Sequence, residues 1–169
     1  MLKFLKTYWL QILVFGAILG YFCYGLSPDM TWVSIGSDQG SYVVAALHNA
    51  PAGLSGNPLY IMLGSVLLHI FSKSNPFWML GLLSSVPMAL TCIVIYFIVK
   101  KFTTSKIAPF IASLAFASFF AVWAEGVIAE TYGISLFVMS LVIWFCVNRK
   151  YYWMEIGRAS CRERVCLYV

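Results

Sequence analysis

Residues 77–99 read FWMLGLLSSVPMALTCIVIYFIV, and no charged side chain interrupts them. Lys73 precedes this run and the pair Lys100-Lys101 follows it. A helix of this length covers the roughly 20 residues needed to cross a ~30 Å hydrocarbon core. The run Phe77–Val99 therefore predicts a transmembrane helix.

Three similar runs lie on either side of it, at Tyr8–Leu26, Ile107–Ala124 and Gly126–Val147. The 169-residue chain is 62% hydrophobic and only 10% charged, whereas a soluble domain carries about 25% charged residues. This composition excludes a soluble enzyme, a nucleic-acid binder and a disordered adaptor. We therefore expect an all-α integral membrane protein with about four transmembrane helices.

A fifth apolar run, Pro58–Ser72, is too short for a full crossing, because as a helix it reaches only ~22 Å. Charge favours the same conclusion. If this run does not span and the N-terminus is cytoplasmic, only Lys73 among the basic residues before residue 155 lies outside, as the positive-inside rule prefers. The residues then inside are Lys3, Lys6, Lys100, Lys101, Lys106, Arg149 and Lys150. The sequence predicts four spans plus one interfacial or re-entrant helix in a long first outer loop, residues 27–75.

The last fifteen residues, 155–169, form a separate segment. The string EIGRASCRERV that opens it resembles the translation of a sequencing adapter, so we exclude it from fold reasoning. A genuine basic cytoplasmic tail is the alternative. We expect residues 1–154 to be the N-terminal part of a multi-pass membrane domain and the natural protein to be longer.

The predicted topology places Asp29, Asp38, Glu125 and Glu130 on the outer face, so candidate chemistry gathers there. Asp38 precedes a short amphipathic helix expected at Tyr42–Leu47. Its carboxylate could cap that helix or act as a general base toward a hydroxyl group.

Glu125 and Glu130 would point about 140° apart on a continuous helix. Only one of them is therefore expected to face a site. We expect this to be Glu130, because an ionisable group at the end of a span needs a polar cavity or the interface, and we expect Glu125 to be solvated. The sequence has no cysteine and histidine cluster with metal-ligand spacing, so no metal site is predicted.

Three polar segments carry a family resemblance: GSDQGSYV at residues 36–43, NPLYIMLG at 57–64, and WAE through AETY at 123–132. They resemble the N-terminal part of the GT-C membrane glycosyltransferases, in the branch related to protein O-mannosyltransferases. The resemblance covers about residues 3–150. It implies transfer of a sugar from a polyprenyl-phosphate donor to a protein, lipid or glycan acceptor at the outer or lumenal face of a plasma, inner or endoplasmic reticulum membrane.

The resemblance also implies roles for particular residues. Asp38 takes the place of the catalytic base and Glu130 that of a second acid. Residues expected to contact substrate or lipid are Tyr60, Asn57, His48, Lys73 and Tyr132. One departure concerns His48, because the family's His-Pro-Pro-Gly approach to the Pro-Leu-Tyr element is replaced here by Leu54-Ser55-Gly56-Asn57.

Lys73 could meet a lipid phosphate or simply extend to the membrane surface. No cofactor is expected beyond the lipid-linked donor, and no nucleic-acid partner. The alternative function is a non-enzymatic multi-pass membrane protein, either a transporter fragment or an assembly subunit.

Overall fold

The computed structural model describes residues 2–30, 38–50 and 57–148. Every regular element within these ranges is a helix. The helices are α1 (Leu2–Gly25), α2 (Gln39–His48), α3 (Pro58–Ile70), α4 (Pro76–Phe102), α5 (Ala108–Ser118), α6 (Phe120–Gly126) and α7 (Tyr132–Val147). The predicted tail at 155–169 lies outside the described residues, as do Ser37, Arg149 and Lys150.

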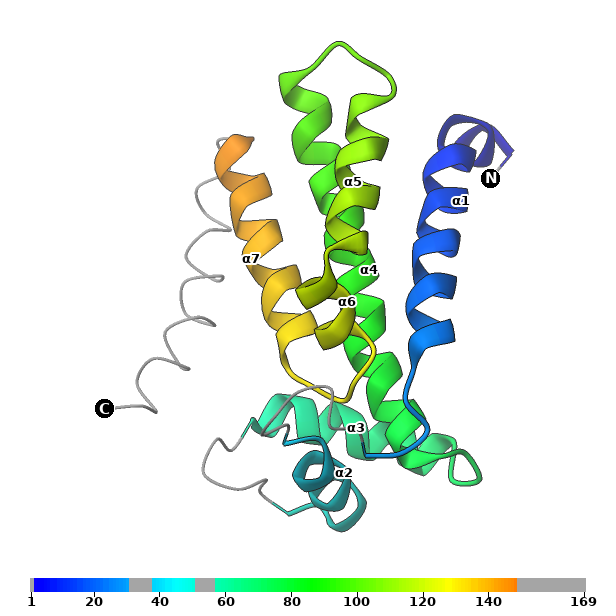
Figure 1. Cartoon of the computed structure of the whole chain (residues 1–169), viewed down its shortest axis with the longest axis vertical. Coiled ribbons are helices and arrows are strands. Elements are labelled where there is room, and N and C mark those ends of the chain that lie inside the picture. Colours follow the sequence, from blue (N-terminus) through cyan, green and yellow to red (C-terminus); the bar gives the residue numbers. More distant parts are fainter. Residues whose placement is uncertain (1, 31–37, 51–56, 149–169) are drawn as a thin grey trace.

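The helices form a bundle with one capped end. α1, α4, α5 and α7 run along the long axis, while α2 and α3 lie across the end at which α1 finishes and α4 and α7 begin (Figure 1). The α4–α5 connection, which carries Lys106, lies at the opposite end. The lysine-rich and acid-rich connections are therefore at opposite ends of the molecule. We call these the lysine end and the acid end.

α4 is the central helix, and it contacts α1, α3, α5 and α7. Asn75 begins it, because its side chain accepts hydrogen bonds from the backbone N–H groups of Phe77 and Trp78. Pro76 follows at the first helical position, where its missing N–H costs nothing. The helix predicted at Phe77–Val99 is confirmed, with Pro87 accommodated inside it.

Among the helical segments whose side chains the structure describes, α4 alone is long and apolar enough to cross a membrane. The pair α5 and α6 passes the same test if it is counted as one span, although it is bent by 66°. The described part of α1 from Gln11, together with α3 and α7, forms shorter apolar helices. The predicted four runs thus become four lengthwise elements, of which α4, and the bent pair α5 and α6 if counted as one, pass the test for a span over their described side chains.

The prediction of a continuous helix over Ile107–Ala124 is wrong, because α5 ends at Ser118 and α6 starts at Phe120. The expected helix Gly126–Val147 also begins late, at Tyr132. The late start of α7 has a tertiary cause. Hydroxyl groups of α4 bind the backbone of Gly126 and Glu130, which holds the segment between them outside a helix.

The two short helices expected in the first loop are confirmed. α2 extends the predicted Tyr42–Leu47 by three residues at its start and one at its end. α3 begins at Pro58 as predicted and ends two residues before Ser72. Both pack at the acid end, so the first loop supplies a folded cap there.

The buried side chains form two clusters. One joins α2, α3 and the start of α4 around Tyr60 and Leu80. The other joins α1, α5, α6 and the middle of α4 around Phe22 and Met88. The irregular segment after α6 contributes Ala129 to the first cluster and Ile128 to the second. This segment is therefore fixed between both halves of the core.

Candidate active site

Two acids predicted to carry the chemistry meet at the acid end. Asp38 directly precedes α2, and Glu130 lies in the irregular segment between α6 and α7. The backbone N–H of Asp38 donates to the Glu130 Oε1 atom at 3.1 Å, across 92 residues of sequence. Glu130 is 6% exposed, whereas Asp38 is exposed. The fold thus pairs a buried acid with an accessible one.

The Glu130 side chain accepts a hydrogen bond at the N-terminus of α2. Asp38 occupies the N-cap position, but its own side chain makes no capping hydrogen bond. The N-cap N–H is instead bound by the carboxylate of Glu130, in the way a glutamate inside the same helix closes a capping box. A negative charge at this point is also stabilised by the positive end of the helix dipole. The carboxylate of Asp38 is consequently not used for capping.

Ser84 of α4 holds the backbone of Glu130 on both sides. Its Oγ atom donates to the Glu130 carbonyl at 2.7 Å and accepts from the Glu130 N–H at 3.0 Å. The neighbouring Ser85 donates to the carbonyl of Gly126 at 2.6 Å. Both serines are fully buried. The pair therefore anchors the acid-bearing segment to the central helix at two points.

Tyr60 of α3 extends this network from the other side. Its hydroxyl donates to the Leu80 carbonyl at 2.9 Å and lies 3.1 Å from the Oγ atom of Ser84. Burial raises the pKa of Tyr60 above its ordinary value; the contact with the Ser84 hydroxyl opposes this, and the nearby Glu130 and Tyr42 add to it. The side chain is 2% exposed, so it supports the site from within. We call Asp38, Glu130, Ser84 and Tyr60 the acid network.

Asn57 is connected to this network through Tyr42. Its Nδ2 atom donates to the hydroxyl of Tyr42 at 2.7 Å. The ring of Tyr42 packs against that of Tyr60, with centroids 5.3 Å apart. Asn57 and Tyr60, both expected to contact substrate, are thus brought to the same end of the fold as Asp38.

The other predicted contacts are not part of the acid network. His48 is exposed in the last turn of α2, about 14 Å from the start of that helix at 1.5 Å per residue. Lys73 is exposed in the turn between α3 and α4. Tyr132 opens α7 two residues after Glu130 and is 52% exposed. Among these three residues, only Tyr132 is close in sequence to an acid of the network.

Glu125 differs from its prediction in two respects. A separation of 140° from Glu130 requires a continuous helix, but α6 ends at Gly126. Glu125 is partly buried instead of fully solvated. Glu130 is the more buried of the two acids because it lies in the fixed segment, which helical spacing could not show.

Ser84 and Ser85 were absent from the residues singled out by sequence. The available signal was two adjacent hydroxyl side chains in the middle of the apolar run at 77–99. A hydroxyl buried in an apolar environment needs a hydrogen-bond partner, and the partners prove to be the backbone of residues 126 and 130.

The arrangement offers acid–base chemistry. Within residues 2–30, 38–50 and 57–148, no three side chains among His, Cys, Asp and Glu gather closely enough to hold a metal ion. An accessible carboxylate with its backbone fixed can accept a proton from a hydroxyl group brought within hydrogen-bond reach. Asp38 has this placement.

Comparison with known proteins bears on these residues. No curated protein and no solved structure matches the chain. One family matches residues 38–164, a range that begins at Asp38 and includes Glu130. The match covers most of the chain. The chain therefore belongs to the family described as the protein O-mannosyl-transferase TMEM260 N-terminal domain.

Proposed function

We propose that this chain takes part in glycosyl transfer from a polyprenyl-phosphate-linked sugar to a hydroxyl-bearing acceptor. The observation that carries the proposal is the hydrogen bond from the Asp38 N–H to the Glu130 carboxylate, which fixes two distant acids at one end of the bundle. Membership of an O-mannosyl-transferase family supports the reaction class. The family's name also supports mannose as the first sugar to test.

In the proposed reaction, the acceptor oxygen attacks the anomeric carbon of the sugar. The bond from that carbon to the phosphate oxygen breaks, and the lipid phosphate leaves. Asp38 takes the proton from the acceptor hydroxyl as a general base. Glu130 is a positioning residue, because it holds the backbone of Asp38 and leaves the Asp38 carboxylate accessible. Asn57, which is hydrogen-bonded to Tyr42, and Tyr132, two residues after Glu130 in the sequence, are the candidates for substrate contacts, whereas His48 and Lys73 would act only at the periphery.

The proposed membrane placement follows the two ends of the bundle. Lys100, Lys101 and Lys106 lie at the lysine end, which the positive-inside rule places in the cytoplasm with the N-terminus. The acid end then faces outward, where α2 and α3 lie across the bundle and could border a lipid-linked donor. A multi-pass GT-C-like membrane domain is consistent with this arrangement, with α3 as an interfacial helix.

The test is the exchange of Asp38 for asparagine in the full-length protein. We expect Asp38→Asn to lower mannosyl transfer from a polyprenyl-phosphate donor by about 10²–10⁴-fold, the contribution typical of a general base. Asp29→Asn, at another exposed acid of the same loop, is the matched control and should keep full activity. Equal transfer by wild type and Asp38→Asn would remove Asp38 from the mechanism, whereas no transfer by the wild-type protein would favour the non-enzymatic alternative.

The positioning role of Glu130 has its own test. Glu130→Gln keeps an oxygen acceptor for the Asp38 N–H, whereas Glu130→Ala removes it. We expect the glutamine variant to retain most of the transfer rate and the alanine variant to lose most of it. If both variants lose activity equally, the charge of Glu130 matters to the reaction itself and the positioning role is wrong.

A further inference from the structure

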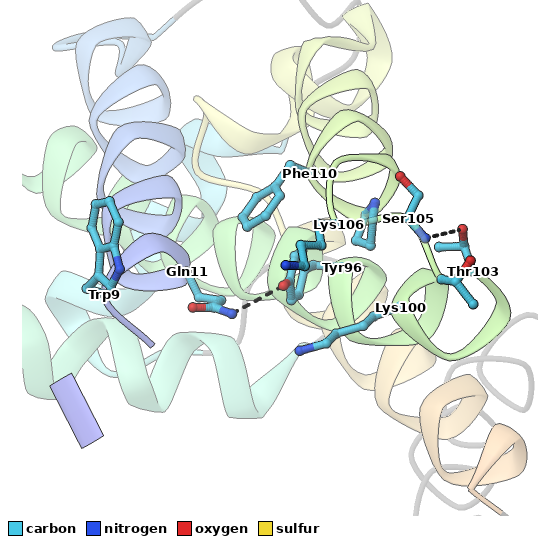
Figure 2. A pocket seen from close by; sticks show the side chains of 10 residues that line it. Trp9, Gln11, Tyr96, Lys100, Thr103, Ser105, Lys106 and Phe110 are labelled. Atoms are coloured by element: carbon cyan, nitrogen blue, oxygen red, sulfur yellow. Dashed lines mark hydrogen bonds between the residues drawn. The ribbon is translucent and has the colours of Figure 1, made fainter. Parts of the chain in front are cut away.

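A second polar site lies at the lysine end, remote from the acid network. It is a pocket of about 610 Å³ between α1, the end of α4 and the start of α5. Figure 2 shows the side chains that line it, which come from these helices and from the α4–α5 connection. Its volume is within the 300–1,000 Å³ range typical of small-molecule sites.

The pocket has a cationic rim. Lys100 and Lys106 both line it, and none of its lining residues is acidic. The ammonium group of Lys100 lies 5.8 Å from the centre of the Tyr96 ring, which keeps it over the pocket wall. Two lysines without a lining carboxylate favour an anion.

Gln11, which lines the pocket, has a buried hydrogen-bond acceptor. The Nε2 atom of Gln11 donates to the hydroxyl of Tyr96 at 3.2 Å. Its Oε1 atom is buried and has no hydrogen-bond partner in the part of the chain that the structure describes. A buried acceptor left unpaired is costly. A ligand that brings a hydroxyl donor would satisfy it, so the expected ligand carries both an anion and a donor.

The first backbone N–H groups of α5 are not available to the anion. The hydroxyl of Ser105 accepts from the N–H groups of Ile107 and Ala108, which closes the start of the helix. Binding would therefore depend on the lysine side chains. This makes the site sensitive to lysine substitutions.

The remaining walls are aromatic and apolar. Phe110 packs against Tyr96 with ring centroids 4.7 Å apart. Trp9, also in the lining, is 58% exposed. Beside the pocket, α5 exposes Ile111, and Ile107 precedes it, also exposed. A charged rim joined to an exposed apolar surface fits an amphipathic molecule better than a free anion.

We propose that the pocket at the lysine end binds the head group of an anionic phospholipid. Lys100 and Lys106 bind the phosphodiester, the Gln11 carbonyl oxygen accepts from a head-group hydroxyl, and the acyl chains leave past Trp9 and Ile111. The inference shares the membrane placement with the proposed function but not its reaction. It concerns the other end of the molecule.

The test uses the full 169-residue chain in detergent, titrated with phosphatidylglycerol or phosphatidylcholine and followed by native mass spectrometry. We expect phosphatidylglycerol to bind at least about tenfold more tightly than phosphatidylcholine. The double variant Lys100→Gln/Lys106→Gln should lose this preference, and Lys100→Arg/Lys106→Arg should keep it. Since both lysines are exposed, neither exchange disturbs the core.

Lys101→Gln is the matched control. Lys101 is exposed next to Lys100 but does not line the pocket, and its ammonium group approaches the Val147 carbonyl at 3.4 Å. It should leave the preference unchanged. Equal binding of both lipids, or equal loss in Lys101→Gln, would overturn the proposal. Displacement of the lipid by millimolar inorganic phosphate would assign the pocket to a soluble anion instead.

Discussion

At the residue scale, the N–H group that precedes α2 donates to a carboxylate 92 residues away, that of Glu130. The side chain of Asp38 would have been the local choice, since aspartate is a preferred N-cap. Because Glu130 binds the N-cap N–H, Asp38 stays accessible. The sequence identified both acids, but not this division of roles between them.

The hydroxyl of Ser84 is the residue-scale contact whose loss should be easiest to measure. Ser84→Ala removes the partner of both the Glu130 N–H and the Glu130 carbonyl in a buried place. We expect a loss of about 1–3 kcal/mol in the free energy of unfolding, the cost of leaving buried backbone groups unpaired. Thermal unfolding of the full chain in detergent measures this.

The control for this substitution is Ser72→Ala, at an exposed serine after α3. It should leave the unfolding midpoint unchanged. The Ser84→Ala variant should also show reduced mannosyl transfer, because the Glu130 backbone would no longer be held. An unfolding midpoint equal to that of Ser72→Ala would show that Ser84 does not anchor the segment.

At the scale of helices, α4 and α7 approach so closely that the contact requires glycine at position 133. A Cβ atom added there would clash with the backbone of Ser84. Gly133→Ala must push α7 away from α4, which we expect to cost about 1–3 kcal/mol, as overpacking does. The measurement is the unfolding midpoint of the full chain in detergent.

Gly20→Ala in α1 provides the matched comparison. A Cβ atom at Gly20 meets nothing within 4 Å, and alanine in a helix interior is more stable than glycine by about 0.5–1 kcal/mol. We therefore expect opposite shifts from the two exchanges. If Gly133→Ala is as stable as wild type, α4 and α7 do not pack as closely as described.

The docking of α3 should depend on pH through Tyr60. Its pKa in the folded state is raised above the ordinary value of 10.0, chiefly by burial. The unfolded chain therefore releases this proton first as the pH rises. The contribution of Tyr60 to stability is complete below about pH 10 and falls as the pH rises toward the folded-state pKa.

Tyr60→Phe should accordingly lower stability near neutral pH, because the hydrogen bond to the Leu80 carbonyl is lost. It should also flatten the decline between pH 10 and higher values. Unfolding midpoints of both proteins across this alkaline range measure the effect. Parallel curves for the two proteins would contradict the burial of a protonated Tyr60.

At the scale of the whole molecule, the separation of the two ends predicts a membrane orientation. Ser72 is exposed near the acid end and Thr104 is exposed at the lysine end. With the native cysteines replaced, a cysteine at position 72 should react with a membrane-impermeant reagent from outside. A cysteine at position 104 should react only after permeabilisation.

Ser37 is a third labelling position, and a cysteine there is expected to react from outside. It lies beyond the described residues and tests independently on which side of the membrane the first loop lies. Reaction of position 104 from outside in intact cells would overturn the orientation. It would also move the lysines out of the cytoplasm, against the positive-inside rule. Reaction of both positions from the same side would overturn the lengthwise arrangement of α4 in a membrane.

Features that depend on local pattern could be predicted from the amino-acid sequence. Uninterrupted apolar runs predicted α4, and Pro58 correctly predicted the start of α3. The short helix after Asp38 followed from amphipathic spacing. The family resemblance singled out Asp38 and Glu130, and the chain belongs to an O-mannosyl-transferase family. Their roles stay predictions.

The positions at which the later helices break, and the burial of Glu130, could not be predicted in this way. No glycine or proline marks the break between Ser118 and Phe120. The segment ending at Glu130 is held by hydrogen bonds from Ser84 and Ser85, which are more than forty residues distant in sequence. Periodicity reports only neighbours along a helix, so it cannot reveal a backbone group satisfied by a side chain from another helix.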